Sequence, residues 1–284
     1  MNTSNLGITR CANGEFRWGE RTFIMGVINV TPDSFSGDGL AHDVEAAIAQ
    51  GKRFAAEGAD ILDIGGESTR PGAAPISPNE ELSRVIPVIG RLASEVSLPL
   101  SIDTYKWEVA REALSTGARM INDIWGLGKD PRLADLAVEW GAPLILMSNQ
   151  RSAKHQHILP EVISSLRASI AVATERGVAW ENIIVDPGVG FGKTLEENLE
   201  IVRRLDELKC LGRPILIGTS RKSMIGLVLD LPTDQRLDGT AATVAISIAK
   251  GADIVRVHDV AQMARVCRMS DAIIRGNVDR KTGD

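Results

Sequence analysis

Polar side chains recur at the points where a series of short apolar runs ends. A buried strand end is a costly place for a carboxylate, an amide or a guanidinium unless the group is paired or binds a ligand. One such residue alone is explained by the capped start of a loop, but capping does not easily explain so many together. The residues at these ends are Asn29, Asp63, Asp103, Asn122, Met147, Asp186, Gly218 and Arg256. We predict that they line one ligand site.

Three of these residues suggest what the ligand is. Asp103, Asn122 and Asp186 supply hydrogen-bond acceptors, and the amide can also donate. A flat heterocycle that carries an amino group beside ring N–H groups pairs with a carboxylate through two parallel hydrogen bonds. The set therefore favours a guanine-like or pterin-like ring over a sugar.

Two further segments are candidates for binding an anion. The run that follows Gly218 reads Thr-Ser-Arg-Lys-Ser-Met, and either Ser220 or Ser223 could simply cap the next helix. Alternatively, free backbone N–H groups, the helix dipole, Ser223 and the two cations Arg221 and Lys222 form an anion site. His258 follows Arg256 by two residues, and a buried, hydrogen-bonded histidine is the simpler explanation for it. The nearby arginine favours a bound phosphate or pyrophosphate.

The sequence Asp-Pro-Gly-Val-Gly-Phe-Gly-Lys-Thr from Asp186 to Thr194 ends like a P-loop. A P-loop requires glycine at position 187, where this chain has Pro187, so we reject that interpretation. We expect the glycines to let Phe191 and the backbone approach a ligand closely.

The apolar runs alternate with helical patterns, which predicts a chain of βα units. The predicted strands span residues 23–30, 59–66, 98–103, 119–123, 142–147, 182–186, 214–218 and 253–257. The predicted helices span residues 41–57, 78–96, 106–115, 131–140, 159–176, 195–208 and 260–275, with shorter segments on either side of a loop at 231–238.

Eight βα units without a linker favour an α/β fold of the (β/α)8 barrel type. The alternative is a doubly wound open sheet, but no GxGxxG follows the first strand. We expect a single domain over residues 1–284, with residues 1–20 as an amino-terminal extension or hairpin. In a barrel, the carboxyl ends of all strands surround one site.

Composition excludes several other classes of protein. The net charge is −5 and no basic cluster stands out, so nucleic acid is not an expected partner. Neither a signal peptide nor an apolar run long enough for a membrane span is present. The scattered cysteines Cys11, Cys210 and Cys267 have neither metal-site nor disulfide spacing, and His42, His155 and His157 suit the surface. We expect a cytoplasmic protein.

Most of the chain, from about Ile24 to Val260, resembles the dihydropteroate synthase family. The resemblance is carried, in order, by NVTPDSFSGDG, DIGGESTRPGA, SIDTYKWEVA, INDIWG, VDPGVGFGKT, GTSRKSMIG and GADIVRVHDV. It implies a TIM barrel that joins 6-hydroxymethyl-7,8-dihydropterin pyrophosphate to p-aminobenzoate, giving 7,8-dihydropteroate and pyrophosphate for folate synthesis. It also implies Mg²⁺ as cofactor, inhibition by sulfonamides, and a homodimer.

The family's residue roles carry over where the motifs match. By resemblance, the pterin is held by Asp103, Asn122, Asp186 and Lys222, with Met147 packed on the ring. The pyrophosphate is held by Asn29, through Mg²⁺, and by Arg256 and His258. The first two loops, with Asp33, Phe35, Thr69 and Arg70, close over the site, and p-aminobenzoate is seated by Phe191 and Ser223 near Gly218. The resemblance also implies that the catalytic residues are Asp103, Lys222, Asp33 and Arg70.

Two positions depart from the expected pattern. The family usually has histidine after Leu-Met, whereas this chain has Ser148, a position we expect to be peripheral. Trp107 is large for its place, and the sequence offers no functional account of it. We also expect residues 31–39 to act as a mobile lid, because proline, glycines and Phe35 suit a segment that orders over ligand.

Two alternative functions stay open from the sequence. A pterin-binding methyltransferase would keep Asp103, Asn122 and Asp186, but it has no use for a pyrophosphate site built on Arg256 and His258. A paralogue that binds pterin with little or no catalysis is the other alternative, and the serine at position 148 keeps it open.

Overall fold

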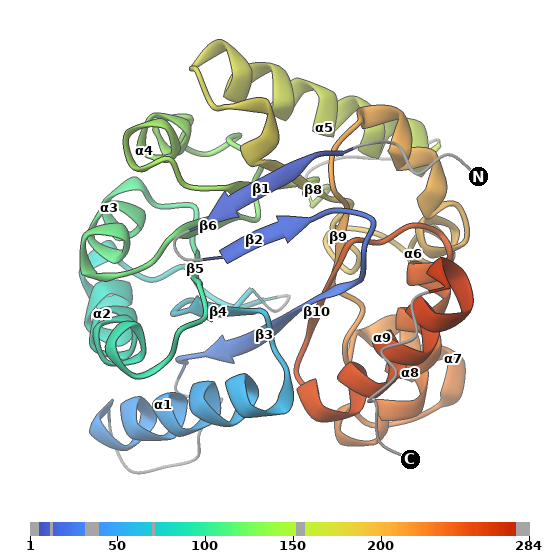
Figure 1. The fold of residues 1–284 in the computed structure, drawn as a ribbon, viewed down its shortest axis with the longest axis horizontal. Helices are drawn as coiled ribbons and strands as arrows, with labels where there is room; N and C mark the ends of the chain where they lie inside the picture. The colour runs from blue at the N-terminus through green and yellow to red at the C-terminus, as the bar shows by residue number, and fades with distance from the viewer. Residues whose placement is uncertain (1–5, 12–13, 32–39, 70–71, 152–156, 277–284) are drawn as a thin grey trace.

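The computed structural model describes residues 6–11, 14–31, 40–69, 72–151 and 157–276, with side chains omitted for residues 40–43. Parallel strands form a sheet in the order β8-β7-β6-β5-β4-β3-β10-β9, and Val185 pairs with Ile215 just ahead of β9, which closes the sheet on itself. The strands are β3 (Phe23–Asn29), β4 (Ile61–Gly65), β5 (Leu100–Asp103), β6 (Met120–Asp123), β7 (Leu144–Met147), β8 (Ile183–Asp186), β9 (Leu216–Ile217) and β10 (Ile254–Val257). The predicted (β/α)8 barrel is confirmed (Figure 1).

Helices surround the barrel, and in the chain most barrel strands are followed by one helix (Figure 1). They are α1 (Leu40–Glu57), α2 (Pro78–Glu95), α3 (Trp107–Thr116), α4 (Arg132–Trp140), α5 (Ile158–Glu175), α6 (Leu195–Arg203), α7 (Ser223–Leu229), α8 (Leu237–Ala249) and α9 (Val260–Arg275). Short 3₁₀ helices occur at η1 (Trp180–Asn182), η2 (Leu205–Leu211) and η3 (Thr233–Gln235).

Local sequence signals explain where several helices begin. The Ser77 side chain accepts the Glu80 N–H at the start of α2, and Pro78 occupies the first turn, where its missing N–H costs nothing. Thr194 and Glu197 form a complete capping box at the start of α6. These caps satisfy backbone donors that would otherwise be orphaned at the helix starts.

Several predicted elements are shorter in the structure, and two of the differences have a clear physical reason. The helix expected over residues 195–208 ends at Arg203, and η2 continues from Leu205 with a tighter turn. Hydrophobic spacing over so short a segment does not separate an α-helix from a 3₁₀ turn. The strand expected from Pro214 shrinks to Leu216–Ile217, because Pro214 has no N–H to donate to a neighbouring strand.

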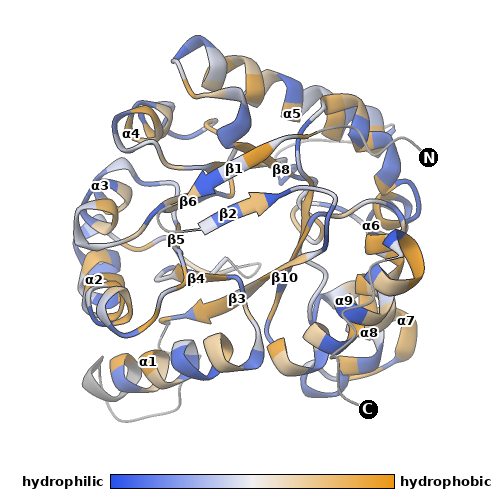
Figure 2. Cartoon of the chain, in the orientation of Figure 1, coloured by the Kyte–Doolittle hydropathy of each residue, from blue (hydrophilic) through white to orange (hydrophobic). Residues whose placement is uncertain are grey.

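The core has an inner and an outer part. Met25, Ile61, Met120, Ile145 and Ile184 fill the barrel interior, whereas a larger set of Val, Ile, Leu and Ala packs between strands and helices. Figure 2 shows β3 and β10 as mainly hydrophobic, and the helices as mixtures of hydrophobic and hydrophilic residues.

An antiparallel hairpin of β1 (Ile8–Cys11) and β2 (Gly14–Arg17) covers the amino-terminal end of the barrel. Phe16 and Trp18 pack on Phe23 at ring-centroid distances of 5.1 and 5.4 Å, which joins the hairpin to the inner core. Trp18 Nε1 donates to Thr9 Oγ1 at 2.9 Å. The hairpin thus seals the end of the barrel where the strands begin.

Candidate active site

Four polar side chains meet inside the carboxyl-terminal end of the barrel. Arg256 Nε donates to Asp63 Oδ2 at 2.6 Å, and Arg256 Nη2 donates to Asp103 Oδ2 at 2.7 Å. Asn122 Nδ2 also donates to Asp63 Oδ2, at 3.0 Å. The network therefore connects β10, β4, β5 and β6 in the way predicted for a single site.

Asp63 differs from its predicted place at the end of a strand. It lies in the middle of β4, two residues after the inward-facing Ile61, so its side chain points into the barrel. The residue is fully buried, and Asp63 Oδ1 has no hydrogen-bond partner among the described residues. A buried carboxylate oxygen without a donor is available to a ligand or a water.

Burial and neighbouring charges shift the pKa values at this end of the barrel. Burial raises the pKa of Asp103 to about 7, against the lowering effect of Arg256 and with a further rise from Asp63. Burial also raises the pKa of Asp186, although Gly188 N–H, 2.7 Å from Asp186 Oδ1, opposes the shift. Burial, followed by repulsion from Arg256, lowers the pKa of Lys222 to about 8.

Lys222 and Phe191 come together where two loops meet. Lys222 Nζ lies 4.5 Å from the centroid of the Phe191 ring, a cation–π contact. A Cβ atom on Gly190 would lie 3.1 Å from Lys222 Cδ, so the glycine permits this close approach. Lys222 is the residue that immediately precedes α7, and its charge also interacts with Asp186 and Asp103.

An apolar wall lies beside these charges. Met147, Ile124 and Phe191 form one buried cluster, with Tyr105 and Trp125 packed against it. Met147 pairs in register with Asp186 across β7 and β8. The structure therefore places an apolar surface for a ring next to a carboxylate that can pair with the ring's edge.

Neither Ser220 nor Ser223 caps α7, although the sequence suggested that one of them could. Ser220 Oγ accepts the His258 backbone N–H at 3.2 Å and lies 3.0 Å from His258 Nδ1. Ser223 is exposed as the first residue of α7, and no side-chain cap bond is made at this described helix start. The capping interpretation is therefore wrong for both serines.

His258 is held neutral. Burial lowers its pKa to about 3, with further lowering from Arg256 and Arg221. Because the Ser220 hydroxyl already accepts a backbone N–H, its own proton is free to be donated to His258 Nδ1. That arrangement leaves the imidazole proton on Nε2, where it can be donated to an anion.

Arg221, which we expected to help bind the anion, is paired with another residue. It adopts a left-handed backbone conformation with φ 57° and donates to Asp259 through Nε at 3.0 Å and through Nη2 at 2.5 Å. Lys222 is then the cation of this pair that remains beside Asp103 and Asp186.

Asn29 is the last residue of β3 and pairs in register with Gly65 of β4. The part of the chain that the structure describes contains no cluster of three His, Cys, Asp or Glu residues able to hold a metal. Mg²⁺ commonly takes one or two protein oxygens and completes its shell with water and substrate phosphates. A lone amide oxygen fits an ion that arrives with a pyrophosphate.

Part of the predicted site lies outside the described residues. This holds for Asp33, Phe35 and Arg70, for the proposed lid beyond Thr31, and for His155. Thr69 is described, and its carbonyl accepts a hydrogen bond from Arg151 Nη2.

The base of the loop after β4 is fixed by Glu67, which sequence reasoning missed. Glu67 Oε1 accepts Tyr105 OH at 3.0 Å, while Oε2 accepts Lys106 Nζ at 2.6 Å and Ile76 N at 3.1 Å. Lys106 also pairs with Glu81, a buried carboxylate whose pKa is raised by burial. The bond to Ile76 joins the two ends of the loop that carries Thr69, and the other two bonds tie that loop to the segment between β5 and α3.

The structure also clarifies the two unusual positions. Ser148 is fully buried, donates its N–H to the Asp186 carbonyl at 2.9 Å and accepts Gln150 Nε2 at 2.8 Å, so it lies in the protein interior just after β7. Trp107 begins α3 with its ring under Arg111 and Arg132, at 4.9 and 5.1 Å. Its contacts therefore lie on the helical layer.

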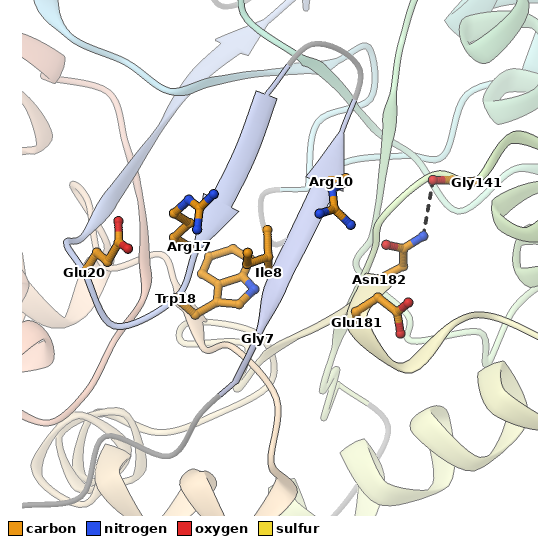
Figure 3. A pocket seen from close by; sticks show the side chains of 9 residues that line it. All are labelled: Gly7, Ile8, Arg10, Arg17, Trp18, Glu20, Gly141, Glu181 and Asn182. Atoms are coloured by element: carbon orange, nitrogen blue, oxygen red, sulfur yellow. Dashed lines mark hydrogen bonds between the residues drawn. The ribbon is translucent and has the colours of Figure 1, made fainter.

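A hollow of about 670 Å³ lies at the opposite end of the barrel (Figure 3). Arg10 and Arg17, two of the residues that line it, both pair with the exposed Glu15. Asn182 Nδ2 donates to the Gly141 carbonyl at 3.2 Å. Both arginines of this hollow are thus paired with a carboxylate, and the hollow is separate from the site.

Comparison with known proteins extends the resemblance seen in the sequence. Residues 25–258 match the model of the family described as pterin binding enzyme. A dihydropteroate synthase from Clostridium beijerinckii is 49% identical over 262 residues, which cover 92% of this chain and 97% of that protein. The chain belongs to the dihydropteroate synthase family.

Solved structures of other dihydropteroate synthases have the same fold. One from Clostridium difficile, in the presence of pteroic acid, has a TM-score of 0.89 and 50% identity, covering 92% of this chain and 99% of that one. One from Xanthomonas albilineans, with 4-aminobenzoic acid, has a TM-score of 0.89 and 42% identity, covering 94% and 97%. No described helix of this synthase is both long and apolar enough to span a membrane.

Proposed function

We propose that this chain condenses 6-hydroxymethyl-7,8-dihydropterin pyrophosphate with p-aminobenzoate, giving 7,8-dihydropteroate and pyrophosphate for folate synthesis. The observation that carries the proposal is the buried network of Arg256, Asp63, Asp103 and Asn122 beside Asp186 and Lys222. The relatives solved with pteroic acid and with 4-aminobenzoic acid support the two halves of this reaction.

The pterin binds with its polar edge toward the carboxylates. Asp186 and Asn122 pair with its amino and ring N–H groups, Lys222 donates to a ring acceptor, and Met147 packs on one face. Arg256 already holds Asp63 and Asp103 in place, so little reorganisation is needed when the ring enters.

The pyrophosphate lies at the β3 and β10 side of the site. His258 donates through Nε2, Arg256 supplies positive charge, and Asn29 would hold Mg²⁺ together with the pyrophosphate oxygens. When bound, Mg²⁺ would neutralise charge that develops on the leaving group.

The reaction exchanges a C–O bond for a C–N bond. The bond between the methylene carbon and the pyrophosphate oxygen breaks, and the electron pair leaves with the pyrophosphate. The ionised Asp103 carboxylate stabilises positive charge on the pterin and its methylene carbon. The amine nitrogen of p-aminobenzoate then attacks, and the proton it loses passes to solvent or a nearby base.

The arylamine enters beside Phe191, near Gly218 and Ser223. Ser223 is exposed at the start of α7, where its hydroxyl can donate to the p-aminobenzoate carboxylate. Thr69, Asp33 and Arg70 close over the two substrates from the first two loops. Sulfonamides, which mimic p-aminobenzoate, are expected to compete at the same place.

A product assay tests the proposal. Purified protein with Mg²⁺ and both substrates should release pyrophosphate and form dihydropteroate, and Asp103→Asn should lower kcat about 100-fold or more with little change in Tm. A folded wild-type protein that binds pteroic acid but yields no product would instead support the non-catalytic paralogue. Transfer of a methyl group from a methylated folate would support the methyltransferase.

We further propose that the enzyme is a cytoplasmic homodimer. Helix α8 packs on both α7 and α9 at one side of the barrel (Figure 1), and the three helices expose a set of large apolar side chains. These are Leu227, Val228, Leu229, Ile246, Met269, Ile273 and Ile274, which we call the α7–α9 face. A second copy of the chain that covers this face would bury a large apolar surface.

A further inference from the structure

The lysine of the rejected P-loop pattern, Lys193, has a clear structural partner set. Lys193 Nζ donates to the carbonyl oxygens of Gly188 at 2.8 Å, Ser148 at 3.1 Å and Phe191 at 3.2 Å. An ammonium group has three N–H donors and no acceptor. All three donors are therefore used within the protein, so Lys193 does not bind substrate directly.

The three carbonyls belong to two segments that cross closely. Ser148 follows β7, whereas Gly188 and Phe191 lie in the loop after β8. A Cβ atom on Gly188 (φ 69°) would lie 2.2 Å from the Ser148 oxygen, and one on Gly192 (φ 70°) would lie 2.3 Å from Arg151 N. Only glycine permits this crossing.

At this crossing three backbone carbonyl oxygens, each the negative end of a peptide dipole, point toward one place. Such an arrangement is repulsive unless a donor or a cation sits between the oxygens. Lys193 supplies both, because its ammonium carries charge and three donors. Burial lowers the pKa of this ammonium to about 8, while Asp186 and Glu197 raise it and Lys222 and Arg151 lower it.

The crossing also holds the proposed substrate-binding residues. The Gly188 N–H donates to Asp186 Oδ1 at 2.7 Å, and the Cβ position of Gly188 lies 3.2 Å from Met147 Cγ. Phe191 donates its N–H to the Gly188 carbonyl at 3.1 Å. A shift of this loop would therefore move Asp186, Met147 and Phe191 together.

We propose that Lys193 is a positioning residue that clamps the loop after β8 to the end of β7 and thereby aligns the pterin and p-aminobenzoate sites. The clamp rests on the proposed function only for the identity of the two substrates. Its geometric part, the alignment of Asp186 and Phe191, applies to any ligand that spans them.

The test compares Lys193→Met with a matched variant at the other end of the barrel. Arg213 is also a buried cation bonded to loop carbonyls, those of Gly212 and Trp180, and it lies just before β9. Arg213→Met removes a similar set of bonds far from the site. We expect both variants to lower Tm, and only Lys193→Met to change substrate binding.

The readouts are the KM of each substrate, kcat, Tm and the Kd of pteroic acid from calorimetry. Lys193→Met should raise both KM values and the pteroic acid Kd about 10-fold, with Lys193→Arg closer to wild type. Lys193→Gln, which keeps two donors, serves if the methionine variant fails to fold, and it should show an intermediate Kd.

Unchanged KM and Kd values in a folded Lys193 variant would overturn the clamp, as would an equal rise in the Arg213→Met variant. A wild-type protein that binds pteroic acid but forms no product would refute the proposed function alone. In that case the calorimetric comparison of the variants still decides the role of Lys193.

Discussion

At the scale of single residues, the site depends on one buried guanidinium that two carboxylates share. Asp63 is fully buried yet accepts from both Arg256 and Asn122, and Asp103 shares the same guanidinium. Removing Arg256 would cost more than either pair contributes, because two buried carboxylates would be left without their cation. Arg256 therefore favours the ionised form of Asp103, whereas Asp63 opposes it.

The shifted pKa values predict a narrow pH optimum. Asp103, with a pKa near 7, must be ionised to stabilise positive charge, and Lys222, with a pKa near 8, must be protonated to donate to the pterin. The value of kcat/KM should therefore rise through pH 7 and fall above pH 8. A profile of initial rates across this range is the measurement.

Lys222→Arg provides the control for the alkaline side of that profile. A guanidinium stays protonated, so the part of the fall that comes from Lys222 should disappear, whereas any part that comes from Lys193, whose pKa burial also lowers to about 8, should remain. A wild-type profile that is flat between pH 6 and 9 would contradict the assignment of both groups.

Several of these residues could be predicted from the sequence, and others could not. Asn29, Asp103 and Asp186 stand out because a polar residue ends an apolar run, and the barrel brings such ends together. Lys193 does not stand out, because its partners are backbone carbonyls, which every sequence contains. Only the folded crossing shows why a lysine is needed there.

At the scale of elements, the loops are fixed at their bases by side chains from neighbouring helices and strands. Glu67 joins Tyr105, Lys106 and Ile76, so the loop after β4 leaves and returns at one carboxylate. Sequence motifs mark this loop as special, but they do not identify Lys106, which precedes the next helix, as its partner. Pairings between βα units depend on the register of the barrel strands.

Glu67→Gln should loosen that loop. The amide keeps an acceptor for Tyr105 but loses the charge that pairs with Lys106, so we expect a loss of about 2 kcal/mol and a fall in Tm of about 5 °C. The KM for p-aminobenzoate should rise several-fold, since Thr69 belongs to this loop. Thermal unfolding and steady-state kinetics are the measurements.

Glu15→Gln is the matched control for that substitution. Glu15 also pairs with two cations, Arg10 and Arg17, but all three side chains are exposed. Exposed ion pairs contribute little, so Tm and KM should both stay near wild type. Equal effects of the two substitutions would contradict the role of Glu67 at the loop base.

At the scale of the whole molecule, the residues that stabilise the barrel and the residues proposed for catalysis lie at opposite ends. The β1–β2 hairpin and its aromatic cluster cover one end, while the charged network occupies the other. The fold class could be predicted because the βα alternation extends along the chain. The helix order around the barrel does not reveal the α7–α9 face, which appears only when exposed fractions are known.

Ile273→Glu together with Met269→Glu should prevent dimer formation. Both side chains are more than 60% exposed on α9, at 70% and 63%, so the substitutions cost the monomer little and place charges in the proposed interface. Light scattering coupled to gel filtration should give the monomer mass. Val138→Glu on α4, where Val138 is 46% exposed, should leave the dimer mass unchanged.

The barrel is closed by very little strand pairing between β8 and β9. β9 has two residues, and Val185–Ile215 is the bridge that links β8 to the segment leading into it. A barrel with one weakly paired joint should open there first, giving a single open sheet that runs from β8 through β3 and β10 to β9. Fragments divided in the turn near Gly212 would then carry intact pairing on each side, with β10 still able to find β3. Asp186 ends β8 and Lys222 follows β9, so these two residues lie on opposite sides of the weakly paired joint. The most easily opened part of the barrel is therefore the part where the two substrates would meet.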